Sequence, residues 1–534
     1  MTKKHPRSPS PDNALRHPST KRAKEIDAES PLSQLYEAMD AQNHDHSPRN
    51  VLHWFRSKDL RIEDNRGLHA ASQKAGEGKG SLLTMYLFSP EDMEWHGTSP
   101  ARVDFILETL KLMQQQLAEK NIPLAIVTAE QRSDKVAKVQ EFIKNHDISH
   151  VYGNYEYEVD ELRRDLKLAH QLAEDKEGQT TLQLCHDQTV VEPGTLTTGS
   201  GGPHKVFTPY HKAWLAEVGS DPSYLETVAA PEPNDSSAKK EFKTLFDSSI
   251  PSVPESKEFP SDDDRKRIRD LWPAGNAAGM QRLREFLNEK VEDYASTRSN
   301  PAADTSSRLS AYFSSGAVSV RQVLSTVSPK ADFSSAGISA WVREVVFREF
   351  YRHMLVVAPH NSLNLPQNLK FDFVQWEDDE EGWRKWCEGK TGVPFVDAGM
   401  RQLEAEAWMH NRLRMNTASY LRANLLIDYR KGERWFAEKL VDWDLANNTQ
   451  GWEPGYTVFN PVTQAEKNDP KGEYIRRWVP ELREVEGKAV FDPYHRLSKE
   501  EFEKLGYPEP HVDFDETKRR CMERYKGDMK DADP

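Results

Sequence analysis

Two hydrophobic periods follow one another along this chain, and the change between them constrains its fold more than any other feature. Between residues 49 and 187, short apolar runs alternate with stretches whose apolar residues recur every three or four positions. The runs are VLHWF (51–55), SLLTMYLF (81–88), PLAIVT (123–128), HVYGN (150–154) and TTLQLCHD (180–187). Buried strands that alternate with helices form parallel sheets with right-handed crossovers. We therefore predict an α/β domain with a parallel sheet over residues 49–187.

From about residue 263 onwards, the apolar residues follow the helical period alone. This predicts a second, mainly α-helical domain over residues 263–487. Residues 188–262 carry clusters of Pro, Gly, Ser and charge, which predict an interdomain linker. Residues 488–534 are highly charged and are expected to form a tail that packs only partly.

Residues 1–48 are rich in Pro, Ser, Asp, Asn and Lys and lack a sustained apolar period, which predicts a disordered basic leader. Its basic residues are Lys3, Lys4, Arg7, Arg16, Lys21, Arg22 and Lys24. The cluster Lys21-Arg22-Ala23-Lys24 is typical of a nuclear-import signal and predicts a nuclear protein. An ordinary solubilising tail is the alternative.

Several classes of protein are disfavoured by what the sequence lacks. No apolar run approaches the roughly 20 residues that span a bilayer, and no signal peptide follows Met1, so we expect a soluble intracellular protein. The three cysteines lie far apart without metal-ligand spacing, which predicts neither a metal site nor a disulfide scaffold. The net charge of −14 argues against nucleic-acid binding by the whole surface, but it leaves a local basic face open.

An ordered set of motifs lies in the helical half. The motifs are TSSRLSAYF (305–313) with Gly316, WVREVVFREFYRH (341–353), and the stretch from KTG (390–392) through WMHNRLRM (408–415) to DWDLANN (442–448). Together with Trp54-Phe55-Arg56 and Leu60-Arg61 at the end of the first strand, this set resembles the class I cyclobutane pyrimidine dimer photolyases of the photolyase–cryptochrome superfamily. The resemblance covers about residues 51–482. It implies that the helical domain binds FAD and that the protein repairs pyrimidine dimers in DNA with light.

The resemblance also implies which residues hold FAD. The matching positions are Tyr294, Ser306, Ser307, Ser310, Arg348, Asn411, Arg414, Asp442, Asp444 and Asn448. Hydroxyl groups near a helix start suit a diphosphate, although a simple N-cap and turn is the alternative for the serines. Arg414 and Asp442 match an ion pair beside the isoalloxazine ring. Asn448 matches the position that faces flavin N5, where an amide can either donate or accept a hydrogen bond.

A second group of positions matches those that contact the flipped lesion. It comprises Glu344, Phe347, Trp408, Asn411 and Met415. The family usually has Trp at the position of Phe347, so the smaller ring predicts weaker stacking on the lesion. Eight basic residues could contact DNA phosphates: Arg343, Arg348, Arg352, Arg412, Lys467, Lys471, Arg476 and Arg477. The alternative is that they only form solvated helix faces.

Trp452 and Trp376 match the inner and outer members of the family's three-Trp photoreduction chain, while the middle position is Tyr429. With Asn448 and Glu344 they complete the predicted catalytic set. Tyrosine is hard to oxidise without losing its proton, which predicts slower electron hopping; a plain core role is the alternative for these rings.

Only six residues, 453–458, separate Trp452 from Phe459-Asn460-Pro461, whereas the family has a longer loop with a second stacking Trp, replaced here by Pro454. This shortening keeps a rival interpretation open: a cryptochrome-like blue-light photoreceptor, or a DNA-binding flavoprotein without repair. A dark flavin oxidoreductase lacks support, because no GxGxxG fingerprint is present.

In the α/β domain, Asp160 and Glu161 match positions that bind an antenna chromophore. The family uses methenyltetrahydrofolate or a deazaflavin there, and an exposed helix start is the alternative for these two acids. The resemblance therefore implies FAD, a second antenna chromophore, and a monomer whose partner is damaged DNA.

Overall fold

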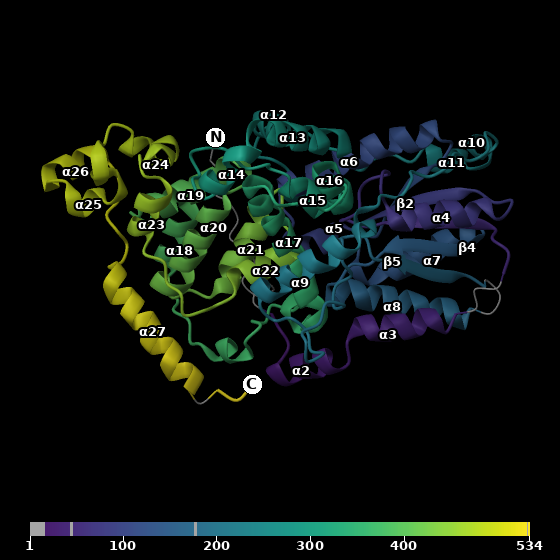
Figure 1. Ribbon diagram of the computed structural model, residues 1–534, viewed down its shortest axis with the longest axis horizontal. Coiled ribbons are helices and arrows are strands. Elements are labelled where there is room, and N and C mark those ends of the chain that lie inside the picture. Colours follow the sequence, from purple (N-terminus) through teal and green to yellow (C-terminus); the bar gives the residue numbers. More distant parts are fainter. Residues whose placement is uncertain (1–15, 43–45, 176–178, 531) are drawn as a thin grey trace.

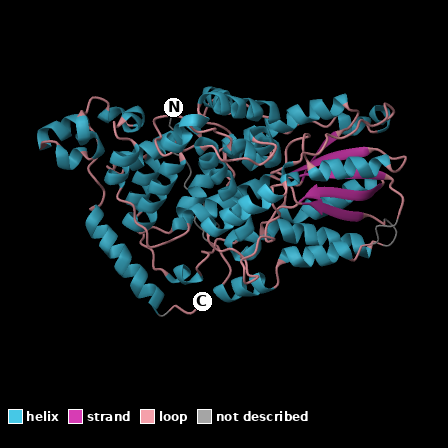
Figure 2. Ribbon diagram, in the orientation of Figure 1, coloured by secondary structure: helices cyan, strands magenta, loops and turns pink. Residues whose placement is uncertain are grey.

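A computed structural model of the chain describes residues 16–42, 46–175, 179–530 and 532–534. A sheet domain lies at one end of the molecule, and helices make up the rest (Figures 1 and 2). Among the described residues, no helix combines the length and apolar character needed to cross a bilayer.

The α/β domain contains a single five-stranded parallel sheet, as predicted. Its strands are β1 (Asn50–Phe55), β2 (Leu82–Phe88), β3 (Leu124–Thr128), β4 (Ile148–Asn154) and β5 (Thr181–Cys185), in the order β3-β2-β1-β4-β5. Side chains that alternate along the strands enter two different cores. Helices α4 (Arg66–Gly76) and α6 (Pro100–Glu119) cover one face, and α7 (Lys135–Asn145) and α8 (Val159–Glu174) cover the other. The short α5 (Pro90–His96) follows β2.

The helical domain surrounds one long central helix, α17 (Ala336–Val357). It packs against α9 (Phe207–Ser220), α14 (Val291–Thr297) and α22 (Leu445–Trp452). The other helices are α12 (Asp262–Leu271), α13 (Asn276–Glu289), α14 (Val291–Thr297), α15 (Ser310–Ser315), α16 (Val320–Val327), α18 (Glu380–Glu388), α19 (Pro394–Glu406), α20 (Asn411–Ser419), α21 (Tyr429–Lys439), α22 (Leu445–Trp452), α23 (Pro461–Asn468) and α24 (Glu473–Trp478). Helices α19 and α20 are separated at Ala407, whose φ of 50° ends α19.

The predicted disorder of the leader is wrong for residues 20–40, which form α2 (Thr20–Ala28) and α3 (Pro31–Asp40). Ser19 and Ser30 cap these helices, and Leu32 and Leu35 are buried where α3 lies against α8 (Figure 1). Apolar residues at helical spacing therefore outweigh the polar composition. Lys3, Lys4 and Arg7 lie outside the described residues.

The prediction of a linker over residues 188–262 is also wrong in part. Helix α9 (Phe207–Ser220) buries Tyr210 and Trp214 in the core of the helical domain. Further along, α10 (Ala238–Glu241) and α11 (Lys243–Phe246) place Ala238 and Leu245 in the core of the sheet domain. The segment thus contributes to both cores.

The predicted tail packs more extensively than its charge indicates. It forms α25 (Pro493–Arg496), α26 (Lys499–Leu505) and α27 (Phe514–Lys530). Three residues of α27, Cys521, Tyr525 and Met529, are buried in a small core with Phe371. The apolar residues of α27 recur every four positions, so one face of an otherwise charged helix is covered.

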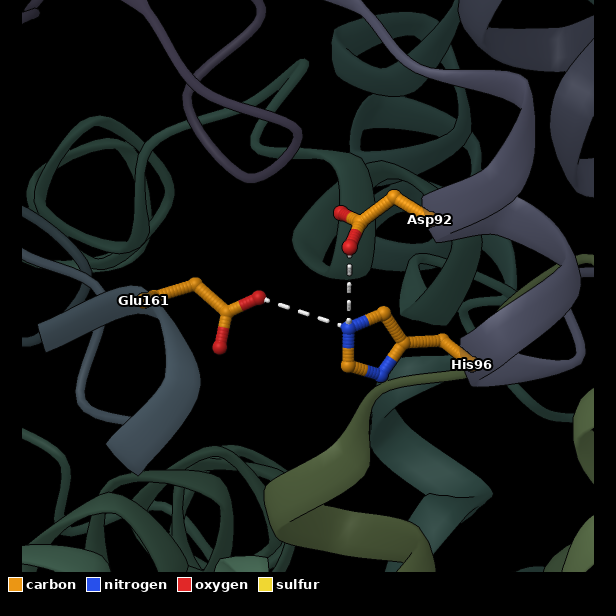
Figure 3. A group of neighbouring side chains, drawn as sticks. All are labelled: Asp92, His96 and Glu161. Atoms are coloured by element: carbon orange, nitrogen blue, oxygen red, sulfur yellow. Dashed lines mark ion pairs between the residues drawn. The ribbon is translucent and has the colours of Figure 1, made fainter. Parts of the chain in front are cut away.

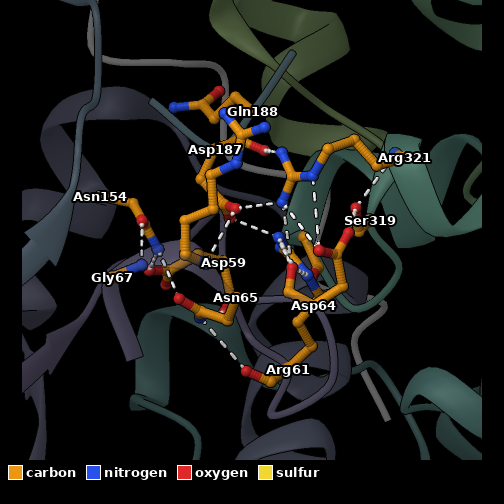
Figure 4. Close-up of polar contacts among 12 residues, drawn as sticks. Asp59, Arg61, Asp64, Asn65, Gly67, Asn154, Asp187, Gln188, Ser319 and Arg321 are labelled. Atoms are coloured by element: carbon orange, nitrogen blue, oxygen red, sulfur yellow. Dashed lines mark hydrogen bonds and ion pairs between the residues drawn. The ribbon is translucent and has the colours of Figure 1, made fainter. Parts of the chain in front are cut away.

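A buried polar network joins the two domains (Figure 4). Arg321 of α16 lies 2.6 Å from Asp187 Oδ1 and 3.2 Å from Asp64 Oδ1. Arg61 also pairs with Asp187 and donates to the carbonyl of Gly316 at 3.1 Å. Because these charged groups are withdrawn from water, each depends on its buried partners, and the contacts of Arg321 and Gly316 cross between the two domains.

Candidate functional site

One face of α17 points toward the predicted flavin site. Glu344, Arg348 and Arg352 recur every four residues and therefore share that face. Arg348 donates to the carbonyls of Gln188 at 2.6 Å and Phe313 at 3.2 Å, and burial lowers the pKa of Arg348 to about 9.

Arg352 does not contact solvent and cannot bind a DNA phosphate, so that prediction is wrong. Its side chain is 1% exposed, and its Nη2 lies 2.8 Å from Asp444 Oδ2. Burial opposes ionisation of Asp444, but Arg352 and other nearby cations lower its pKa below the ordinary value. The sequence had indicated Asp444 as a flavin contact, but it had not indicated its cationic partner.

The predicted pair of Arg414 and Asp442 is present. Arg414 Nη2 lies 2.7 Å from Asp442 Oδ2, and Arg414 Nε donates to the carbonyl of Met409 at 2.8 Å. The pair joins α20 to the segment that precedes α22, so it brings together two of the sequence motifs. Asp442 is nearly buried, which strengthens a charged hydrogen bond.

The predicted phosphate-binding serines lie around the start of α15. Ser307 Oγ accepts from Trp341 Nε1 at 3.2 Å, and Ser310 Oγ accepts from Trp408 Nε1 at 3.2 Å. The first bond ties the serine cluster to α17. The second ties it to Trp408, a predicted lesion contact, so the flavin and lesion sets of residues meet here.

Ser306 and Ser307 also line a polar cavity of about 340 Å³. The cavity wall carries three cationic side chains, Arg282, Lys290 and Arg308, and four acidic ones, Asp270, Glu285, Asp304 and Glu406. Arg308 already pairs with Asp304 and Glu406, so the serine hydroxyl groups are the part of this wall that suits a diphosphate. Tyr294, another predicted flavin contact, is buried and packs against Phe286. It does not line this cavity.

Helix α22 places Asp444, Asn448 and Trp452 four residues apart, at its N-cap, middle and end. Asn448 Nδ2 donates to the carbonyl of Glu433 at 3.0 Å. This bond fixes the amide and leaves its oxygen available as an acceptor. The arrangement agrees with an amide that faces a flavin ring.

Several buried polar atoms in this region lack a hydrogen-bond partner in the described part of the chain. They are Asp442 Oδ1, Asp444 Oδ1 and Arg348 Nε. Unpaired buried acceptors and donors are costly unless a ligand satisfies them. FAD carries N–H and O–H donors for carboxylates and phosphate oxygens for a guanidinium, so these residues fit it.

The predicted lesion residues lie on two helices, Glu344 and Phe347 on α17 and Asn411 and Met415 on α20, with Trp408 buried just before α20. Arg298 pairs with Glu344, and the adjacent Ser299 accepts from Arg412 Nη2 at 2.8 Å. Burial raises the pKa of Glu344 above its ordinary value. Asn411 and Met415, also on α20, are exposed and in contact through Asn411 Nδ2 and Met415 Sδ at 4.0 Å.

Phe347 has one ring face already covered. Its ring stacks on Phe207 with a centroid separation of 3.3 Å and an interplanar angle of 11°. Only the remaining face or edge is free for a base. This supports the expectation of reduced stacking at this position.

The structure brings together two of the three predicted electron-transfer rings. Trp376 and Tyr429 lie 6.0 Å apart between ring centroids. Trp452, by contrast, contacts Phe436 at 4.9 Å and Trp386 at 6.0 Å. Trp386 was not indicated by the motifs, because its position in the sequence resembles an ordinary core tryptophan.

The shortened loop over residues 453–458 is held by side chains around it. Arg422 Nη1 donates to the carbonyl of Gly455 at 3.0 Å, and the carboxylate of Glu453 accepts from the backbone of Gln367 at 3.0 Å. Tyr456 reaches Met529 Sδ of α27 at 3.7 Å. The short loop is therefore an ordered connection that rests partly on the C-terminal helix.

In the α/β domain, a pocket lies at the carboxyl ends of β1 and β2, where ligands bind in open parallel sheets. Trp54, Phe55, Tyr86 and Glu161 are in its wall, and Trp443 of the helical domain helps to enclose it. Its volume is about 110 Å³. The predicted antenna residue Glu161 thus faces the pocket.

The other predicted antenna residue, Asp160, does not line the pocket and instead pairs with Arg132 at 2.9 Å. Figure 3 shows Glu161 beside His96 and Asp92. Arg132 and Lys135 lie 2.7 and 2.9 Å from Asp92 Oδ1. These two cations already neutralise the carboxylate, which disfavours a divalent cation in this group.

Comparison with known proteins agrees with both halves of the molecule. The profile described as DNA photolyase matches residues 51–233, and the profile described as the FAD binding domain of DNA photolyase matches residues 341–527. The deoxyribodipyrimidine photo-lyase of Neurospora crassa is 40% identical over 501 residues, which cover 89% of this chain and 81% of that protein.

Two solved structures are similar along almost the whole chain. The class III photolyase of Agrobacterium tumefaciens has a TM-score of 0.75 and 31% identity, covering 92% of this chain and all of that one. The archaeal photolyase of Sulfolobus tokodaii, solved with two FAD molecules, has a TM-score of 0.70 and 26% identity, covering 90% of this chain and 100% of that one.

Proposed function

This chain belongs to the DNA photolyase family, and we propose that it is a deoxyribodipyrimidine photo-lyase that uses light to repair cyclobutane pyrimidine dimers in DNA. The observation that carries this assignment is the Arg414–Asp442 pair beside the unpaired oxygens of Asp442 and Asp444, within the matched FAD-binding region. When bound in reduced form, FAD supplies the electron that splits the dimer.

The residues of this chain bind and orient the cofactor and the substrate. Asp442 and Asp444 present acceptors, each held by a cation, Arg414 and Arg352 respectively. The serine cluster at the start of α15 would hold the diphosphate. Asn448 is fixed by the carbonyl of Glu433, and its side-chain oxygen would be available to the flavin ring.

On the lesion side, a flipped dimer would meet Trp408, Phe347 and Glu344. A damaged pair stacks poorly, so its extrusion from the duplex is comparatively cheap. Glu344, held by Arg298, has a carboxylate that would accept a hydrogen bond from a base N–H. Arg298 and Arg412 provide positive charge near that carboxyl for the DNA backbone.

The direct test uses purified protein with reduced FAD and an oligonucleotide that contains one pyrimidine dimer. Illumination is expected to remove the dimer, while the same mixture in the dark keeps it. Protein that binds FAD and the oligonucleotide but leaves the dimer unchanged in light would contradict the proposal and favour a photoreceptor.

The pocket at the carboxyl ends of β1 and β2 supports a second proposal, that an antenna chromophore binds there with Glu161 in the wall. Trp54, Tyr86 and Trp443 offer aromatic surface for a flat heterocycle. Reconstitution with methenyltetrahydrofolate and with a deazaflavin tests which chromophore it takes. Light absorbed by the chromophore that binds should excite FAD by energy transfer. A Glu161→Ala variant should lose this energy transfer.

We also propose a nuclear location and a monomeric state. Helix α2 leaves Lys21, Arg22 and Lys24 exposed, so an import receptor could reach them. A fluorescent fusion in which these three residues are alanine should leave the nucleus. Light scattering of the purified protein should give the mass of one chain.

A further inference from the structure

The middle position of the predicted electron-transfer chain is poorly suited to oxidation. Tyr429 is buried, and its Oη has no hydrogen-bond partner in the part of the chain that the structure describes. Burial raises the pKa of Tyr429 well above its ordinary value. A phenol that loses an electron becomes strongly acidic, and here no group is placed to take the proton. Tyr429 therefore resists oxidation.

A different ring is in contact with Trp452. The ring of Trp386 lies 6.0 Å from that of Trp452 at an angle of 70°. Trp386 in turn stacks on Trp383 at 5.5 Å and 20°, and Trp383 contacts Trp435 at 6.0 Å. Four indoles thus form one continuous series of ring contacts.

We propose that Trp386 and Trp383 replace Tyr429 and Trp376 as the route by which electrons reach Trp452 when oxidised FAD is reduced by light. This inference rests on the proposed function, because it requires FAD beside Trp452. One electron leaves Trp452 for the photoexcited cofactor. One electron then passes from Trp386 to Trp452, and one from Trp383 to Trp386, so the positive charge ends on Trp383.

The surroundings of the rings explain why the charge stops there. Trp386 is fully buried, and its N–H donates to the carbonyl of Thr417 at 3.0 Å, which holds a positive ring but cannot accept its proton. Trp435 has the ammonium of Lys439 4.8 Å above its ring, and this cation opposes a second positive charge. Trp383 has 8% of its surface exposed, so its edge can reach solvent.

At Trp383 the electron is restored from outside. A thiol in solution gives one electron to the oxidised indole and releases its proton to water. Two of the resulting thiyl radicals combine into a disulfide. If no thiol is present, the indole N–H proton passes to water and a neutral indole radical remains.

The experiment follows flavin photoreduction in the full-length protein loaded with oxidised FAD, under blue light with excess dithiothreitol and without oxygen. Trp386→Phe and Trp383→Phe should each lower the yield by about tenfold or more, which corresponds to about 1.4 kcal/mol of added barrier. Tyr429→Phe and the matched control Trp478→Phe, on the partly buried Trp478 of α24, should stay close to the unsubstituted protein. Without thiol, electron paramagnetic resonance should detect an indole radical that Trp383→Phe removes.

Two results would overturn the proposal: full photoreduction in both Trp386→Phe and Trp383→Phe, or a large loss in Tyr429→Phe alone. Trp383→Phe provides a second reading if Trp386→Phe fails to fold or to retain FAD. The proposed function is checked separately, by dimer repair in the unsubstituted protein after chemical reduction of FAD with dithionite. Repair together with normal photoreduction in both Trp variants would reject only the electron route.

Discussion

Arg414 Nη2 lies 2.7 Å from Asp442 Oδ2, while the other carboxylate oxygen of Asp442 is buried and unpaired among the described residues. The cation fixes the orientation of the carboxylate. Its free oxygen is then a strong acceptor for an N–H donor of the cofactor. The Arg414–Asp442 ion pair thereby contributes to cofactor binding.

Asp442→Asn should therefore weaken FAD binding. An amide in place of the carboxylate loses one charged hydrogen bond, which is worth about 1.5–3 kcal/mol or roughly ten- to a hundredfold in Kd. Flavin fluorescence, which rises on release, measures the change during dilution. Asp263→Asn, at an exposed acid of α12, is the matched control. Equal retention of FAD by the two variants would contradict the assignment of Asp442.

Phe347→Ala should weaken binding of dimer-containing DNA more than binding of undamaged DNA. Stacking of a base on an aromatic side chain stabilises binding by about 1–3 kcal/mol. We expect a loss near the lower value, roughly fivefold in Kd, because Phe207 covers one face of the Phe347 ring. Fluorescence anisotropy with the two oligonucleotides measures both affinities. Phe373→Ala, at an exposed phenylalanine, serves as the control. An equal loss for both DNAs would show that Phe347 does not contact the lesion.

The pH dependence of stability should reveal the buried carboxyl of Glu161. Burial, together with Glu158 and Glu156, raises the pKa of Glu161 to about 8. A carboxyl with a raised folded-state pKa binds its proton more tightly in the folded than in the unfolded protein. It therefore lowers the free energy of unfolding increasingly as the pH rises from about 4.5 toward 8. Glu161→Gln removes this penalty and should stabilise the protein by about 2 kcal/mol at pH 9, with little effect at pH 5.

Urea unfolding at the two pH values measures this difference for Glu161→Gln. Glu119→Gln, at an exposed glutamate of α6, should show no pH-dependent gain. If Glu161→Gln were equally neutral at pH 9, the carboxyl would be solvated and the wall of the pocket would be open.

The architecture was predictable because the spacing of apolar residues along the sequence indicates which side chains are buried. The five apolar runs became the five parallel strands, and the predicted α-helical domain is present. Composition was a poorer guide. Residues 20–40 read as polar and disordered, yet a few apolar residues such as Leu32 and Leu35 suffice to pack α3 on α8.

The site was predictable only where its residues lie within motifs. The Arg414–Asp442 pair followed from the motifs, because both members belong to them. The sequence predicts a phosphate contact for Arg352, because it does not show which face of a long helix is buried in the protein. The contact of Trp386 with Trp452 joins residues 66 positions apart, and only the tertiary packing shows it.

The domain interface depends on Arg321, so its loss should destabilise the whole protein. Its guanidinium is fully buried between Asp187 and Asp64 (Figure 4). Arg321→Met keeps the apolar stem but leaves two buried carboxylates with less positive charge. Breaking a buried pair in this way costs about 3–5 kcal/mol at pH 7, measured by urea unfolding. Arg384→Met, at an exposed arginine of α18, should stay within experimental error.

The effect of Arg321→Met should shrink on acidification. Burial opposes the charge on Asp187, but Arg61 and Arg321 hold its pKa well below the ordinary value. The stability that this lowered pKa provides is present above about pH 4 and is lost as pH falls further. In the variant Asp187 keeps only Arg61 as its cationic partner and takes up a proton more readily as the pH falls, so the difference from the unsubstituted protein should be smaller at acidic pH than at pH 7. Adding Asp187→Asn to Arg321→Met should recover part of the loss at pH 7, because one uncompensated charge is removed. A pH-independent loss with no recovery would mean that packing of the Arg321 stem, rather than charge, holds the two domains together.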